Sequence, residues 1–190
     1  MSADDLRVRV IALGSPHGGD DEAALRFAAK LAKECAQRAD GAPAFEVISA
    51  GRPGPGLVDL LDVARPVVLL DVVRSGAPPG TLHELPLAAL VDAALAHGQV
   101  SSHGFGPAEA LRLAAALGRQ LPCGAFVGIE GEAFELGAPL SPPVAASMGR
   151  FAAAARAAIE RFAATELGTT PGPERTPARG GALRAEVNDG

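Results

Sequence analysis

Apolar and β-branched residues gather into short runs along the chain, and each run is closed by glycine, proline or a charged residue. Leu6–Leu13 is one such run and predicts a buried strand that ends at Gly14. Pro66–Val73 has the strongest strand character and carries a single carboxylate, Asp71, near its end. The same pattern predicts further strands over Phe45–Ala50, Gly124–Glu130 and, as a short piece, Thr81–Pro86.

Between these runs the apolar positions change to helical spacing. The segment Asp20–Arg38 places its apolar side chains three to four residues apart, which predicts an amphipathic helix. Shorter helices are predicted over Leu57–Ala64, Leu87–His97 and Pro107–Leu117, and a long one over Ser141–Phe162, with Ser141 as its N-cap. Because strands alternate with helices, the chain predicts an α/β fold with a mostly parallel sheet covered by helices on both faces.

Length and composition divide the 190 residues into one domain and a tail. Eight of the 23 residues in 168–190 are glycine or proline, so that segment cannot bury enough apolar surface to fold, and we expect it to be disordered. The domain is then 1–167 and holds the whole net charge of −5, with no Lys/Arg cluster to attract nucleic acid. The acidic start and the absence of a membrane-length apolar run predict a cytoplasmic protein without membrane insertion.

Polar side chains follow several predicted strands at the end where ligands bind to parallel sheets. The first strand leads into GSPHGGDDE, which contains Asp20, Asp21 and Glu22. Asp71 ends the third strand, His103 precedes the Pro107 helix in the sequence SSHGFG, and Glu130 ends the last strand. Carboxylates and an imidazole without a thiolate suit a divalent ion such as zinc or nickel, which could serve hydrolysis.

Each of these residues also has a structural interpretation. The three acids of the first loop open a helix, where its dipole favours negative charge. Asp71 is costly inside an apolar strand without a partner, so a salt bridge explains it as well as a functional role does. His103 could be a surface or capping residue. The loop lacks both phosphate-binding glycine motifs, and the chain has no G-x-S-x-G elbow, so nucleotide binding and a serine nucleophile are both disfavoured.

Four stretches, in order along the chain, match the landmark motifs of one family. VIALGSPHGGDDEAA matches a strand running into G-N-x-x-x-x-D-[DE]-G-x-G, at Gly14, Asp20 and Asp21. LLDVVRSGAPPGTLHEL matches a strand ending in D-[AV] before a G-x-x-P-G-[TS] loop, at Asp71, Gly76, Pro79, Gly80 and Thr81. SSHGFGPAEA matches S-[ST]-H before a helix, at Ser101, Ser102 and His103. VGIEGEAFELGAPLSPPV matches V-G-I-E-P and G-x-x-L-S-P-x-V, at Val127–Glu130, Gly137, Leu140–Pro142 and Val144.

With these motifs the chain resembles the hydrogenase maturation proteases, endopeptidases that trim the C-terminal extension from the large-subunit precursor of nickel–iron hydrogenases. The resemblance implies a three-layer αβα sandwich of the phosphorylase/hydrolase-like kind with roughly five strands. It also implies that Asp21, Asp71 and His103 are the catalytic residues and bind a nickel ion that arrives with the precursor. Asp20, Glu22 and Glu130 become neighbours of that site. The chain departs from the motifs at Ser15, Glu22, Ala24 and Gly131.

The leading hypothesis is therefore a monomeric, metal-dependent peptidase acting on a hydrogenase large-subunit precursor. A water activated by the metal or by one of the two carboxylates, in an aspartyl-protease-like manner, would be the nucleophile. The departures from the family motifs motivate an alternative, a non-catalytic binding protein that checks whether the precursor carries nickel. Cleavage of the precursor distinguishes the two hypotheses.

Overall fold

A five-stranded sheet organises the chain, in a computed structural model that describes residues 7–37, 45–61, 63–91 and 105–166. The strand order across the sheet is β2-β1-β3-β5-β4. All neighbouring strands run parallel except β4, which pairs antiparallel with β5. The strands are β1 (Val8–Leu13), β2 (Phe45–Gly51), β3 (Val67–Val73), β4 (Leu82–Pro86) and β5 (Gly124–Glu130).

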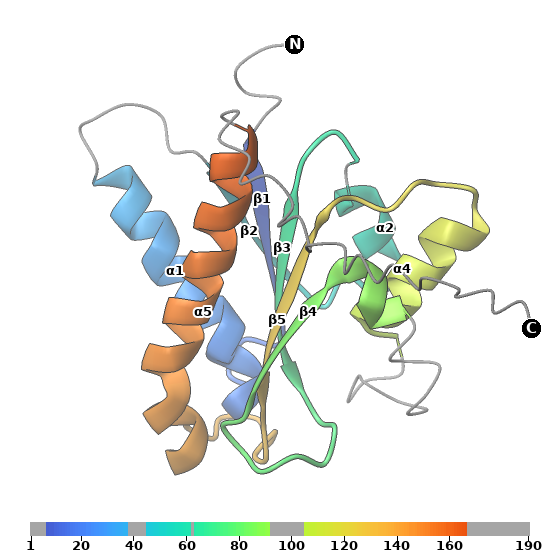
Figure 1. Cartoon of the computed structure of the whole chain (residues 1–190). Helices are drawn as coiled ribbons and strands as arrows, with labels where there is room; N and C mark the ends of the chain where they lie inside the picture. Colours follow the sequence, from blue (N-terminus) through green and yellow to red (C-terminus); the bar gives the residue numbers. More distant parts are fainter. Residues whose placement is uncertain (1–6, 38–44, 62, 92–104, 167–190) are drawn as a thin grey trace, which may run out of the picture.

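Helices cover both faces of this sheet, as Figure 1 shows. One face carries α1 (Ala23–Ala36) and α5 (Pro142–Glu166), and the other carries α2 (Leu57–Leu60) and α4 (Pro107–Ala116). Residues 87–91, directly after β4, are also helical. The three-layer αβα arrangement with a mostly parallel sheet is therefore confirmed.

Two apolar cores form because successive side chains of a strand point to opposite faces. Val68, Leu70 and Val72 of β3 pack with α1 and α5, while Val67, Leu69 and Val73 pack with α2 and α4. Every residue of β3 is buried, as expected for a central parallel strand. The continuous apolar run that predicted this strand reflects burial on both faces.

The starts of α1 and α5 differ in detail from the prediction. The helix predicted from Asp20 begins at Ala23, because Gly19–Glu22 forms a separate 3₁₀ turn. Ser141 precedes α5, and its carbonyl accepts the Ala145 N–H at 2.8 Å, but its hydroxyl has no hydrogen-bond partner within the described residues. Pro143 follows at the second helical position and has no N–H to offer to a capping side chain. The predicted tail, 168–190, and the second half of the helix predicted to end at His97 lie outside the described residues.

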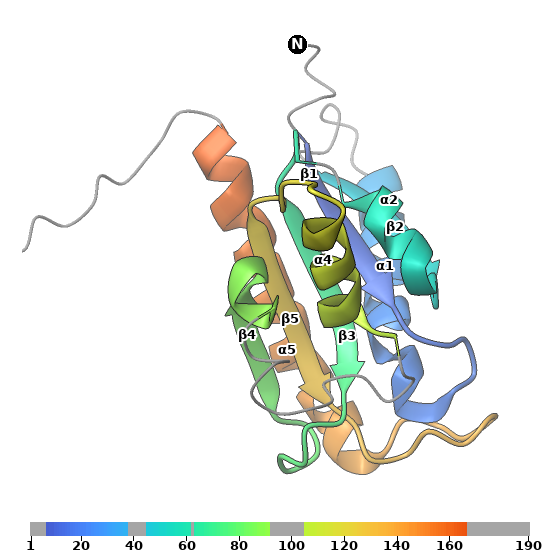
Figure 2. The ribbon, with the colours of Figure 1, turned by 90° about the vertical axis from the view of Figure 1, so that its right-hand side faces the viewer.

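The order in which strands are added to the sheet reverses at β1, because β2 lies on one side of β1 and β3 lies on the other. From β1 the chain passes through α1 to β2 on one side, whereas β3 pairs with β1 on the other side. Figure 2 looks onto the α2/α4 face, where the arrowheads of β3 and β5 mark the edge at which the parallel strands end. In open α/β sheets, ligands bind at such a switch point. Among the described residues, no helix combines the length and the apolar character needed to cross a membrane.

Candidate active site

The turn after β1 brings Asp21 back against the end of that strand. Gly14 has a φ of +131°, and a Cβ at this position would lie 1.9 Å from the Asp21 carbonyl oxygen. The Ser15 N–H donates to the same oxygen at 3.2 Å. Glycine is therefore required at position 14, because only a residue without a side chain lets the 3₁₀ turn close over it and present Asp21 at the switch point.

Asp71 reaches the same region from β3. It shares the alternation of Leu69 and Val73, so its side chain belongs to the face covered by α2 and α4. The residue is 9% exposed, and its Oδ1 accepts the Val72 N–H at 2.8 Å. The carboxylate near the end of the apolar run is thus buried at the carboxyl edge of the sheet.

A cavity of about 260 Å³ brings the two carboxylates together, because both Asp21 and Asp71 line it. Its remaining walls come from the ends of β1, β2 and β3, from the loop after β2, from α2, and from the start of α4 with the two residues before it. Those residues are Leu13, Gly14, Gly51, Arg52, Pro53, Gly54, Leu57, Val72, Phe105, Gly106 and Pro107. Three of the four regions singled out from the sequence therefore contribute to one cavity.

Arg52 is a member of this site that sequence analysis did not find. Its Nη2 donates to Asp21 Oδ2 at 2.7 Å, and its Nε donates to the same oxygen at 3.3 Å. Arg52 directly follows β2, so the rule that selected residues at strand ends would have selected it as well. A positive side chain is not a metal ligand, so Arg52 has no place in the predicted set of carboxylates and imidazole.

The surroundings of Asp71 in the cavity shift its pKa. Burial raises the pKa of Asp71 from its usual 3.8 to about 7. The Val72 N–H and the Arg52 guanidinium lower that pKa, while the negative charge of Asp21 raises it, and burial outweighs the rest. Asp71 can therefore gain or lose a proton near neutral pH, as a general acid or base must.

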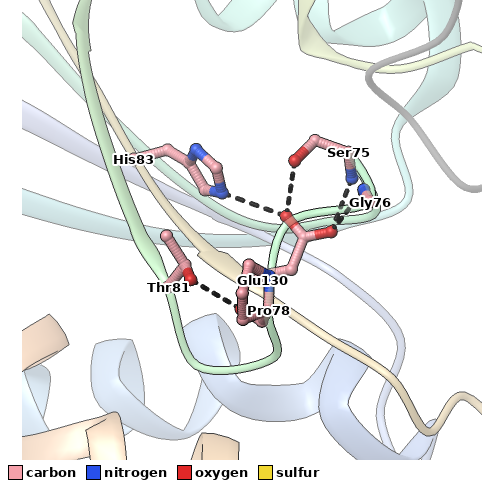
Figure 3. A network of polar contacts seen from close by, with 6 residues as sticks. All are labelled: Ser75, Gly76, Pro78, Thr81, His83 and Glu130. Carbon is pink, nitrogen blue, oxygen red and sulfur yellow. Dashed lines mark hydrogen bonds and ion pairs between the residues drawn. The ribbon is translucent and has the colours of Figure 1, made fainter.

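Glu130 is buried close by but has a different kind of environment, drawn in Figure 3. Its Oε1 accepts the N–H groups of Ser75 and Gly76 at 2.7 and 2.9 Å. Its Oε2 accepts the Ser75 hydroxyl at 2.8 Å and lies 3.0 Å from His83 Nε2. Four contacts saturate the carboxylate, which ties the loop between β3 and β4 to the end of β5. Glu130 is not among the residues that line the cavity.

Asp20 also anchors a loop. Its carboxylate accepts three backbone N–H groups at 2.7 to 3.0 Å, from Glu132, Ala133 and Ser141. These contacts attach the connection between β5 and α5 to the turn after β1, rather than capping α1. Glu22 pairs with Arg26 at 2.8 Å, one helical turn away, outside the cavity. Of the acids in the first loop, only Asp21 lines the cavity.

His103, with Ser101 and Ser102, lies outside the described residues. Phe105, two positions later in the sequence, lines the cavity. The described residues contain no group of three or more His, Cys, Asp or Glu side chains able to hold a metal ion. Asp21 and Asp71 are the two members of the expected ligand set that can be placed.

Two of the departures from the family motifs, Ala24 and Gly131, can be placed relative to the cavity. Ala24 is fully buried in the core between the sheet and α1, away from the cavity. A Cβ at Gly131 would lie 2.7 Å from the Phe134 ring and 2.7 Å from the Val72 side chain. Phe134 thus occupies the space that a larger residue at position 131 would need. Neither Ala24 nor Gly131 lines the cavity.

Fold and site together define an α/β protein with two carboxylates in one cavity at the switch point of its sheet. A family model described as hydrogenase maturation protease matches residues 29–158, more than half of the chain. The chain belongs to the hydrogenase maturation protease family. Asp71 and His103 lie inside the matched range, and Asp21 precedes it.

Solved structures support the same assignment of fold. The hydrogenase maturating endopeptidase HybD from Escherichia coli superposes with a TM-score of 0.66 at 22% identity, over 82% of this chain and 93% of that one. The [NiFe] hydrogenase maturation protease HybD from Thermococcus kodakarensis has a TM-score of 0.61 at 24% identity, over 80% of this chain and 97% of that one. No curated protein matches the chain by sequence.

Proposed function

We propose that this chain is a processing endopeptidase that removes the C-terminal extension from the large-subunit precursor of a nickel–iron hydrogenase. Membership of the hydrogenase maturation protease family supports the peptidase class and the kind of partner. One observation links the proposal to particular residues: the carboxylates of Asp21 and Asp71 line the same cavity.

Among the buried acids at this edge of the sheet, Asp71 has contacts of a different kind from those of Asp20 and Glu130. The carboxylates of Asp20 and Glu130 are satisfied by hydrogen bonds from loops that they anchor. Asp71 instead accepts its own neighbour's N–H, and its charge is opposed by burial. A buried carboxylate held in this way costs folding free energy, which favours a role in chemistry over a role in stability.

In the proposed reaction, Asp71 takes a proton from a water as the water oxygen attacks the scissile carbonyl carbon. The same carboxyl group then gives the proton to the departing amine, so the peptide bond breaks with no net gain of protons. In the free protein the pKa of Asp71 is about 7, so the carboxyl group can both accept and release a proton near neutral pH. The described cavity walls contain no Ser, Thr or Cys, in agreement with water as the nucleophile.

We further propose that nickel is part of the substrate and that Asp21, Asp71 and His103 recognise it inside the loaded precursor. Carboxylate oxygen and imidazole nitrogen are suitable donors for this ion. A carboxylate has two oxygens, so Asp71 can contact the ion through one and a water through the other. His103 enters this set by its position in the S-[ST]-H motif.

The test is to incubate the purified chain with nickel-loaded and nickel-free precursor and to measure the precursor mass. We expect loss of the C-terminal extension from the loaded precursor alone. A stable complex with the loaded, uncleaved precursor would instead identify a binding protein that checks nickel loading. Cleavage of both precursors at equal rates would contradict nickel recognition while leaving the peptidase assignment in place.

A further inference from the structure

We propose that Arg52 acts as a selectivity residue that keeps free divalent cations out of the cavity, so that the site accepts nickel only when the precursor presents it. The inference rests on the proposed function, because it concerns how that site tells loaded precursor from dissolved metal. It assigns a role to a residue outside the ligand set of Asp21, Asp71 and His103.

The geometry places Arg52 where an entering cation would have to go. Two N–H groups of the guanidinium converge on Asp21 Oδ2, at 2.7 and 3.3 Å. Asp21 is almost fully buried, with its side chain 3% exposed, so the oxygen that Arg52 contacts is shielded from bulk water, although Arg52 itself is half exposed. A cation that ligates the same oxygen must displace or share these hydrogen bonds.

Charge adds to this competition. The two cavity carboxylates carry at most two negative charges, and Arg52 compensates one of them. A divalent ion held between Asp21 and Asp71 would also lie close to the positive guanidinium, and repulsion between like charges is strong in a poorly solvated site. Dissolved nickel therefore meets a site that already contains a competing cation, and we expect it to bind weakly.

Arg52 can nevertheless leave when the precursor binds. Its side chain is 48% exposed, so part of it is already solvated, and turning it outward gives the guanidinium more contact with water in place of its bonds to Asp21. The precursor can offset the loss of the Asp21–Arg52 pair with its own contacts to the protein, which a dissolved ion cannot make. The Asp21–Arg52 ion pair therefore weakens the binding of free nickel more than it weakens the binding of nickel inside the precursor.

A second arginine in the same region provides a matched control. Arg26 pairs with Glu22 at 2.8 Å, and its side chain is 49% exposed, close to the value for Arg52. Glu22 is the sequence neighbour of Asp21, but Arg26 does not line the cavity. Arg26→Gln removes the same charge from the same region without removing the competitor of the ion.

The experiment titrates NiCl₂ into the full, untagged chain and measures the dissociation constant by calorimetry. We expect Arg52→Gln to bind Ni²⁺ about tenfold more tightly than the wild type, or better. Arg26→Gln should stay within about twofold of the wild type, because Arg26 pairs with Glu22 and neither residue lines the cavity. Adding Asp21→Asn to Arg52→Gln should remove the gain, and far-UV circular dichroism verifies that each variant is folded.

Equal Ni²⁺ affinity of Arg52→Gln and the wild type would overturn the inference, as would a gain that Asp21→Asn leaves untouched. An equal gain from Arg26→Gln would also overturn it, because the effect would then be general electrostatics. Precursor cleavage by the wild type is a separate measurement. Cleavage without any gain in affinity contradicts the role of Arg52 alone, whereas a gain without cleavage contradicts the proposed function alone.

Discussion

Replacing Asp71 by Asn should make the folded chain more stable at alkaline pH. The substitution keeps the size of the side chain and an oxygen for the Val72 N–H, but it removes the negative charge that burial opposes. A site residue that costs stability in its active form is the expected signature of a catalytic group. The effect depends on pH, so it can be separated from any general effect of the substitution.

The magnitude follows from the pKa of Asp71, which burial raises from 3.8 to about 7. Between these two values the folded chain holds the proton while the unfolded chain has released it. Unfolding then releases a proton, so the free energy of unfolding falls as the pH rises through this window and levels off above it. A shift of roughly three units corresponds to about 4 kcal/mol, which is the upper limit for the wild type's extra loss between about pH 4 and 8.

The assay is urea unfolding of the wild type and Asp71→Asn across this pH range. Far-UV circular dichroism is the probe, because the chain has neither Trp nor Tyr for fluorescence. Other titrating groups are common to both proteins, so the difference between their free energies of unfolding isolates Asp71. Asp59→Asn is the matched control, since Asp59 is 75% exposed and pairs with Arg119 at the surface.

We expect the advantage of Asp71→Asn over the wild type to grow by several kcal/mol between pH 4 and 8, within the limit of about 4 kcal/mol. Asp59→Asn should show no comparable trend. A difference between Asp71→Asn and the wild type that stays constant across this range would refute the reasoning, because Asp71 would then ionise as readily in the folded chain as in the unfolded one.

Three further outcomes follow from the same contacts. Asp20→Ala should lower the free energy of unfolding by about 3 kcal/mol or more, because three backbone N–H groups lose their acceptor. An unchanged urea midpoint would contradict the role of Asp20 as an anchor for the connection between β5 and α5. Glu130→Gln should cost about 1–3 kcal/mol in the same measurement, because the N–H groups of Ser75 and Gly76 lose a charged acceptor; an unchanged urea midpoint would contradict this. The kcat/KM of precursor processing should fall as the pH drops below about 7, because this quantity reports the free enzyme, in which Asp71 becomes protonated. A kcat/KM that stays flat between pH 5 and 8 would exclude Asp71 as the base.

Much of the fold could be predicted because its three central strands, β1, β3 and β5, are buried on both faces. A run such as the one that became β3 has few interpretations other than a central parallel strand, and the structure buries all seven of its residues. The antiparallel direction of β4 could not be predicted, because it depends on pairing with β5 rather than on local pattern. The start of α1 was misplaced by three residues, because the acids that suggested a helix cap form a 3₁₀ turn.

Part of the cavity lining could be predicted from the sequence, and the remainder depends on contacts between segments that are far apart in the chain. Sequence can place a carboxylate at the end of a strand, but it cannot show which way the side chain turns or what donates to it. Asp21 and Asp71 line the cavity, whereas Asp20 and Glu130 are used by loops that lie far from them in the sequence. Arg52 was missed because its importance comes from pairing with Asp21, 31 positions earlier.

The most direct test of the paired-carboxylate site is the mass of nickel-loaded precursor after incubation with folded Asp21→Asn, Asp71→Asn and His103→Ala variants. Each variant should leave the C-terminal extension attached, while the wild type and the surface variant Asp59→Asn release it. Release of the extension by folded Asp71→Asn at the wild-type rate would contradict the assignment of catalysis to this cavity.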